Sequence, residues 1–143
     1  MKSLNVLVQR WLSENVLPLP GESANAVKAA FGRLGSLATA DVIDLYAAIG
    51  GMNNMDAELW RYWPLAEIVA ENTTSSPFGI LFADYMVSSW CYRLKEISQS
   101  TSAVYIDFFD GGEPKLIAES LEEFLNKYIE DPTSLLYGAP AAR

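Results

Sequence analysis

The spacing of apolar residues changes along this chain, and the change limits the folds open to it. In residues 4–12, 27–34 and 42–49 the apolar positions recur every three or four residues, the pattern of one helical face. From residue 78 onward, short apolar runs and strict alternation take over, and these are patterns of strands. Helical spacing returns in residues 121–129. Helices, then consecutive strands, then a closing helix predict an α+β fold rather than alternating βαβ units.

Helix-breaking and capping residues set the ends of the predicted helices. The first helix ends before Pro18 and Pro20, because proline lacks a backbone donor and restricts the residue that precedes it. Thr39 is the predicted N-cap of the third helix, which ends at the pair Gly50-Gly51.

The closing helix has the clearest start. Ser120 and Glu123 form an S-x-x-E capping box ahead of an apolar stripe. Asp131 and Pro132 predict one more helical turn, because they have the residue types of an N-cap and a first helical position. Residues 138–143 predict a fraying tail.

Several segments have the residue pattern of strands. They are residues 60–63, 78–83, 90–95, 104–109 and 115–118. Apolar residues alternate with others in the third and fourth of these segments, which predicts a hairpin whose strands turn one face to the core. Pro64 is expected at the first position of a short helix over residues 65–70. The predicted sheet is mostly antiparallel and is backed by helices.

The chain is acidic, with one cysteine and no histidine. Its 143 residues fit a single domain, and its formal net charge at pH 7 is −8. A surface of that sign repels phosphate, which disfavours nucleic acid and anionic membranes as partners. Cys91, as the one cysteine, allows no disulfide within the chain, and no apolar run approaches the ~20 residues of a membrane span. We therefore expect a cytoplasmic, cytosolic domain.

These residue types exclude the commonest catalytic and metal sites. Without histidine the chain has no Ser-His-Asp triad, no Cys-His pair and no imidazole ligand. Arg93 can lower the pKa of Cys91, yet a packed thiol on a strand is the favoured interpretation. Asp107, Asp110 and Glu113 bracket a Gly-Gly turn and are interpreted as turn-forming acids, not as ligands of a hard cation. We expect no enzymatic activity, no cofactor and no metal.

Two groups of acids are the favoured partner-binding surfaces. One lies in residues 41–71 and the other in residues 104–131, and the fold can bring them together. The aromatic residues of 60–63 and 90–92 are interpreted mainly as core, with a few at an interface. The residues predicted to contact a partner are Asp107, Asp110, Glu113, Glu122, Glu123, Asp56, Glu58 and Trp60.

Four segments, in order, resemble the SUKH superfamily, in particular its Smi/Knr-type domains. They are Asp44 to Gly51, a helix that ends in a Gly pair; Trp63 to Ile68, a strand that enters a short helix; Phe82 to Tyr92, a strand pair; and Ile117 to Leu125, the closing helix. The resemblance covers residues 39–136 and leaves 1–38 unmatched. Ile49 stands where the family usually has Asn before the Gly pair.

The resemblance implies a role as well as a fold. Bacterial members of the family neutralise polymorphic toxins by direct binding, and no shared catalytic residues accompany the fold. The expectation is a non-enzymatic immunity protein whose partner is a basic toxin domain. The alternative is a regulatory or scaffold domain without a toxin partner, and an enzyme ranks below both.

Overall fold

The computed structural model describes residues 1–137 and confirms the predicted α+β fold. The tail predicted over residues 138–143 lies outside the described residues. The elements are α1 (Lys2–Ser13), α2 (Ala24–Arg33), α3 (Ala40–Ala48), β1 (Trp60–Tyr62), α4 (Leu65–Glu71), β2 (Ile80–Tyr85), β3 (Trp90–Glu96), β4 (Ser102–Asp107), β5 (Lys115–Ala118), α5 (Leu121–Glu130) and the 3-10 helix η1 (Pro132–Leu135). None of the helices within residues 1–137 is both long and apolar enough to cross a membrane.

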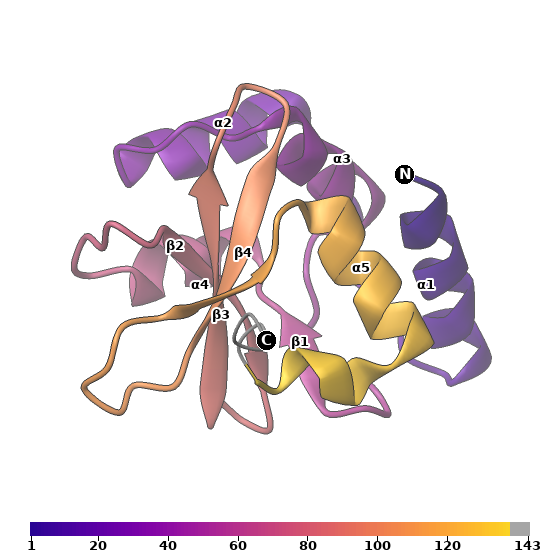
Figure 1. Cartoon of the computed structure of the whole chain (residues 1–143). Coiled ribbons are helices and arrows are strands. Elements are labelled where there is room, and N and C mark those ends of the chain that lie inside the picture. Colours follow the sequence, from indigo (N-terminus) through magenta and orange to yellow (C-terminus); the bar gives the residue numbers. More distant parts are fainter. Residues whose placement is uncertain (138–143) are drawn as a thin grey trace.

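The five strands form one antiparallel sheet in chain order, β1-β2-β3-β4-β5 (Figure 1). Each strand pairs with the next one along the chain, so short connections suffice and no crossover is needed. The predicted hairpin is confirmed: β3 and β4 pair from Cys91↔Asp107 to Glu96↔Ser102.

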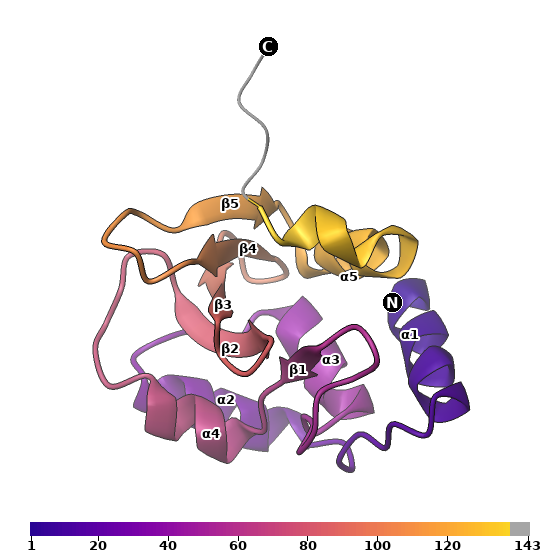
Figure 2. The same cartoon turned by 90° about the horizontal axis from the view of Figure 1, so that it is seen from below.

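The helices cover the sheet in two groups. Helix α5 contacts β4 and β5 and also packs against α1, whereas α4 contacts β2 and packs against α2. Figure 2 shows these groups beside different edges of the sheet. Helix α3 joins them, because it contacts both α2 and α5.

Aromatic rings from β1, β2, β3 and α5 meet at the centre of the core. Phe124 lies with its ring centroid 5.4 Å from that of Tyr92, 6.1 Å from Phe82 and 6.5 Å from Tyr62. All four side chains are fully buried. The edge-on geometry of these three pairs is one that aromatic quadrupoles favour. This cluster fixes α5 against the sheet.

Strand β3 departs from the predicted one-sided burial. Tyr92 and Leu94 face the core as expected, but Cys91 and Arg93 on the opposite face are also buried. Arg93 is buried because Asp107 accepts from its Nε at 2.9 Å and the Gly79 carbonyl accepts from Nη1 at 2.8 Å. The alternating pattern therefore predicted the position of the strand correctly, but it did not predict that Cys91 and Arg93 on the second face are buried as well.

The helix starts agree with the predictions in position and differ in chemistry. Ser120 Oγ accepts from Glu123 N at 3.0 Å, as a capping box requires. The Glu123 carboxylate, however, accepts from Glu119 N and not from Ser120 N, so the second bond of the capping box is replaced. Thr39 makes no cap bond, because its hydroxyl contacts Asp41 and Ser102.

Two further boundaries concern the prolines. Pro64 precedes α4 as its N-cap residue instead of occupying the first helical position. Pro132 does begin the predicted extra turn, η1, which Asp131 caps by accepting from Thr133 N at 3.1 Å.

Candidate functional site

The strand register aligns two rows of side chains across β1 to β4 at one end of the sheet. The polar row is Arg61, Asp84, Cys91 and Asp107. The aromatic row is Trp60, Tyr85 and Trp90, continued by Phe108, which directly follows β4 and contacts the Trp90 ring. Because side chains alternate along a strand, the two neighbouring rows point to opposite faces of the sheet.

The aromatic row runs from the core to the surface. The centroids are 4.5 Å apart for Trp60 and Tyr85, 5.5 Å for Tyr85 and Trp90, and 5.4 Å for Trp90 and Phe108. Trp60 is buried, whereas the other three rings are half-buried. Tyr137 extends the row outward: its ring lies 6.5 Å from that of Trp90 and its side chain is 67 % exposed.

Four segments meet at this end, which we call the loop end: residues 53–59, 86–89, 108–114 and 132–137. Met86 N donates to the Leu59 carbonyl at 2.9 Å and joins the first two segments. The Trp90 ring contacts those of Phe108 and Tyr137 and ties in the other two. Figure 2, seen from below, looks onto this end. The large exposed apolar residues of the loop end are Met55, Met86, Val87, Phe109 and Tyr137.

Three of the predicted partner-binding residues are exposed at the loop end. Glu58, Asp110 and Glu113 lie on its rim, from two loops that are far apart in sequence. Asp110 also accepts from Gly112 N at 2.9 Å, as the turn interpretation predicts.

Three others are buried, and both carboxylate oxygens of each of the two acids among them already accept hydrogen bonds within the protein. The exposed fractions are 5 % for Asp56, 2 % for Trp60 and 7 % for Asp107. Trp60 belongs to the core end of the aromatic row. Asp107 accepts from Arg93 Nε and from Phe109 N, both at 2.9 Å, so it holds the turn and neutralises a buried guanidinium. These three residues were predicted to contact a partner, and their side chains offer almost no surface for such a contact.

Asp56 has a structural role instead. Its carboxylate accepts from the backbone N of Glu58 and Trp60, from Trp11 Nε1 at 2.9 Å, and from the Tyr128 hydroxyl. Burial raises the pKa of Asp56, and the hydrogen bonds from Trp11, Trp60 and Glu58 oppose that rise.

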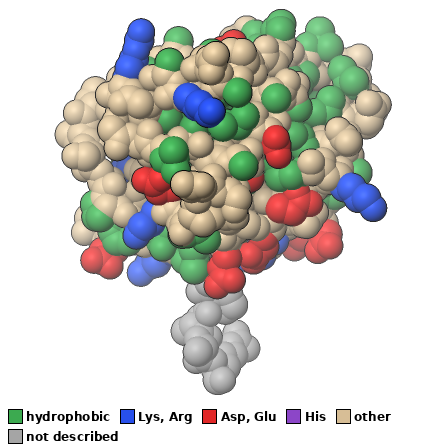
Figure 3. All heavy atoms as spheres, turned by 90° about the horizontal axis from the view of Figure 1, so that it is seen from above, with side chains coloured by type: hydrophobic (Ala, Val, Ile, Leu, Met, Phe, Trp, Pro, Cys, Tyr) green, Lys and Arg blue, Asp and Glu red, His purple; other side chains and the backbone are tan. Residues whose placement is uncertain are grey.

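The last two predicted residues, Glu122 and Glu123, lie away from the loop end. They begin α5, which follows the C-terminal end of β5, whereas Asp110 and Glu113 precede β5 (Figure 1). The hydrogen bond from Glu119 N, with the ion pair to Lys127 at 3.1 Å, lowers the pKa of Glu123. Seen from above in Figure 3, acidic side chains gather along the lower edge of the view. The two predicted acidic groups therefore come together only in part, through Glu58, Asp110 and Glu113 at the loop end, while Glu122 and Glu123 lie apart.

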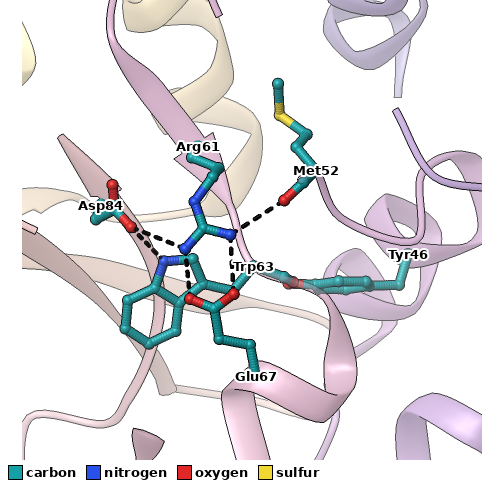
Figure 4. A network of polar contacts seen from close by, with 6 residues as sticks. All are labelled: Tyr46, Met52, Arg61, Trp63, Glu67 and Asp84. Atoms are coloured by element: carbon teal, nitrogen blue, oxygen red, sulfur yellow. Dashed lines mark hydrogen bonds and ion pairs between the residues drawn. The ribbon is translucent and has the colours of Figure 1, made fainter. Parts of the chain in front are cut away.

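Arg61 and Asp84 of the polar row belong to a network that joins α3, β1, α4 and β2 (Figure 4). Arg61 donates to both carboxylate oxygens of Glu67, to Asp84 Oδ2 at 3.3 Å and to the Met52 carbonyl at 3.1 Å. Trp63 Nε1 donates to the same Asp84 oxygen at 2.6 Å. The Tyr46 hydroxyl donates to the Trp63 carbonyl at 2.7 Å.

Cys91 sits in the polar row between two aspartates. Burial, with the negative charges of Asp84 and Asp107, raises the pKa of Cys91 to about 12, and the opposing effect of Arg93 is smaller. The geometry agrees with the predicted packed thiol.

Neither a metal site among the described residues nor a matching family or curated protein was found for this chain. Within residues 1–137, no three His, Cys, Asp or Glu side chains are grouped so that they can hold a metal ion. No protein-family model matches the chain, and no curated protein matches it.

Sequence reasoning missed the Arg61–Asp84–Glu67 network and the half-buried rings of Tyr85 and Phe108. Both depend on cross-strand register. The alternation in β3 and β4 was visible, but the pairing of Tyr85 with Trp90 follows from the length of the β2–β3 turn.

Proposed function

We propose that this chain is a cytoplasmic, non-enzymatic binding module that neutralises a basic toxin domain by docking to it through the loop end. The aromatic and acidic composition of that end carries the proposal. Trp90, Phe109 and Tyr137 offer ring surface there, and Glu58, Asp110 and Glu113 place negative charge beside it. Stable interfaces have this arrangement, in which aromatic anchors near the centre are ringed by polar residues.

The charge balance of the surface supports a basic partner. Of the eighteen acidic residues, only Asp56, Asp84 and Asp107 are buried. Two of the ten cations form ion pairs with partly or fully buried acids: Arg61 with Glu67 and Asp84, and Arg93 with Asp107. The surface therefore keeps a negative surplus, which speeds encounter with a positive partner. A toxin domain that acts on nucleic acid has such a positive surface, and an acidic protein can cover it.

Co-expression with the product of the adjacent gene tests this function. We expect a stable complex and rescue of cell growth when that product is a toxin. Phe109→Ala and Tyr137→Ala should each weaken binding about tenfold or more, as truncation of an interface aromatic does. Leu37→Ala is the matched control, since Leu37 is also exposed but lies in the α2–α3 connection, and its effect should stay within about twofold.

Three results would count against the proposal. Equal losses for Leu37→Ala and Tyr137→Ala would remove the loop end from the interface. A neighbouring product that binds but has no toxicity would favour a regulatory or scaffold domain. Catalytic turnover by the purified chain would return the enzyme class to consideration.

A further inference from the structure

We infer that the polar face of the loop end holds a pocket for one cationic side chain, a guanidinium or an ammonium group, with Asp84 as its anchor. The inference rests on the proposed function in one respect, namely that the cation belongs to a protein partner. The pocket lies on the other face of the sheet from the aromatic row, and the β2–β3 turn separates the two.

A cavity of about 250 Å³ opens beside Asp84 and Arg61. Its walls come from the 53–55 loop and the β2–β3 turn, with Asn53, Met55 and Val87 among the lining residues. Ligand pockets for drug-sized molecules span about 300–1,000 Å³, so this cavity is small for such a ligand. One long side chain is an occupant of suitable size.

Asp84 has an oxygen that is free to accept a hydrogen bond. The residue is 2 % exposed and lines the cavity. Its Oδ2 atom accepts from both Trp63 and Arg61, whereas Oδ1 accepts no hydrogen bond from any of residues 1–137. Figure 4 shows the second carboxylate oxygen directed away from these two donors. A carboxylate can accept several hydrogen bonds, and a buried one gains when its remaining oxygen receives a donor.

The charges of the network select a cation. Glu67 and Asp84 share the single guanidinium of Arg61, which leaves one negative charge in excess. Both terminal nitrogens of Arg61 already donate to Glu67, Asp84 or the Met52 carbonyl. Of these three charged groups, Arg61 and Asp84 line the cavity and Glu67 does not. Because the terminal nitrogens of Arg61 are already bonded, the unbonded Asp84 oxygen and the net negative charge of the network favour a cation over an anion there.

The cavity walls suit the stem of a long basic side chain. Met55 and Val87 are exposed apolar residues, and methylene groups of Lys or Arg pack on such surfaces while the charged head reaches a polar group. The β2–β3 turn that supplies part of this wall has positive φ angles at Met86, Val87 and Ser88, of 51°, 54° and 62°. A β-branched residue such as Val87 seldom adopts that conformation.

NMR titration with N-acetyl-arginine amide tests the pocket without any partner. The reporter is the Trp63 indole N–H, which donates to Asp84 and can be assigned with Trp63→Phe. We expect shifts at this signal and at the amides of Met55 and Ser88, and none at the Trp11 indole, which is bonded to Asp56. N-acetyl-glutamine amide, which carries no charge, should leave all four signals in place.

Two substitutions and one control locate the effect. Asp84→Asn should abolish the shifts, but it also alters bonds to Trp63 and Arg61 and can affect folding. Val87→Lys is the safer variant, because Val87 is 77 % exposed and its replacement should not disturb folding. The new ammonium group would either occupy the mouth of the cavity or repel the cationic probe there. Val87→Lys should weaken binding of the probe at least about tenfold, because the lysine blocks the cavity and repels a like charge. Ile97→Lys adds the same charge at the other end of β3 and should leave binding unchanged within about twofold.

The outcomes separate the pocket from the proposed function. Probe shifts that Val87→Lys removes support the pocket, whether or not the neighbouring gene product binds. The pocket proposal is overturned if the probe causes no shifts, or if it causes equal shifts in Val87→Lys and Ile97→Lys. In that case, a complex that still depends on Phe109 and Tyr137 would leave the proposed function intact.

Discussion

The hydroxyl of Tyr128, on α5, hydrogen-bonds to the buried carboxylate of Asp56, which lies 72 positions earlier in the chain. The Trp11 indole of α1 donates to the same oxygen at 2.9 Å. One side chain thus fastens the first helix and the closing helix to the loop that precedes β1. Both donors are themselves buried, so these hydrogen bonds are shielded from solvent.

Tyr128→Phe should lower the free energy of unfolding by about 1 to 3 kcal/mol, because it removes one donor from a buried carboxylate and leaves the ring in place. Tyr137→Phe removes a hydroxyl from an exposed ring and should change stability by less than about 0.5 kcal/mol. Urea denaturation of the two variants measures the difference. Equal effects would mean that the Tyr128 hydroxyl contributes nothing through Asp56.

The role of Asp56 shows where sequence reasoning stops. Its acidic character, next to Glu58, suggested a charged surface. The donors that bury it, Trp11 and Tyr128, are 45 and 72 positions away, and no local pattern links them to it. By contrast, the S-x-x-E motif at Ser120 located the start of α5, because capping is decided within one turn.

Phe124→Ala should destabilise the protein by about 3 to 5 kcal/mol, since it opens a cavity among Tyr62, Phe82 and Tyr92. Phe109→Ala is the control: the same truncation at a side chain that is mostly exposed should cost less than about 1 kcal/mol. Thermal or urea unfolding compares them. A loss below about 1 kcal/mol for Phe124→Ala would mean that α5 does not rely on this contact.

Gly79→Ala should destabilise by about 3 kcal/mol or more, for two separate reasons. Gly79 has φ +100°, and an added Cβ would lie 2.0 Å from the Leu94 carbonyl oxygen. Gly111 also has positive φ, +86°, but its Cβ would meet open space, so Gly111→Ala should cost only about 1 to 2 kcal/mol. Similar losses for the two variants would show that β2 shifts away from β3 at little cost.

Native Cys91 should be inert toward a thiol reagent at pH 8, because burial raises its pKa to about 12 and leaves almost no thiolate. The reaction should reach its normal rate when the protein is unfolded in urea. A Cys91→Ser protein that carries Ser75→Cys is the control, since Ser75 is exposed and its thiol should react at once. Rapid reaction of native Cys91 would contradict the packed interpretation.

The site was harder to predict than the fold because it is made by register. Trp90 and Phe108 were placed on strands from their alternation, yet their contact depends on the pairing of Cys91 with Asp107. Glu122 and Asp110 are near in sequence, but Asp110 lies in the β4–β5 connection and Glu122 in the first turn of α5, so β5 separates them. Short-range patterns locate elements, whereas a surface depends on which element ends come together.

Reversal of charge at the loop end should slow association with a basic partner more than the same reversal elsewhere. The triple variant Glu58→Lys, Asp110→Lys, Glu113→Lys changes exposed acids on the rim of the loop end. The control triple, Asp44→Lys, Glu71→Lys, Glu96→Lys, makes an equal change of net charge at exposed positions on α3, α4 and β3.

Both triples should fold, because exposed charges contribute little to stability. Rim charges act mainly on the association rate, and screening extends over roughly 8 Å at physiological salt, so the difference between the triples should be largest at low salt. Stopped-flow or surface-based kinetics with the neighbouring gene product, at two ionic strengths, measures it. We expect the loop-end triple to associate at least about tenfold more slowly than the control triple at low salt, with a smaller gap at high salt. Equal rates for the two triples at both ionic strengths would mean that the acids of the loop end do not steer the partner, and the aromatic residues alone would then have to account for docking there.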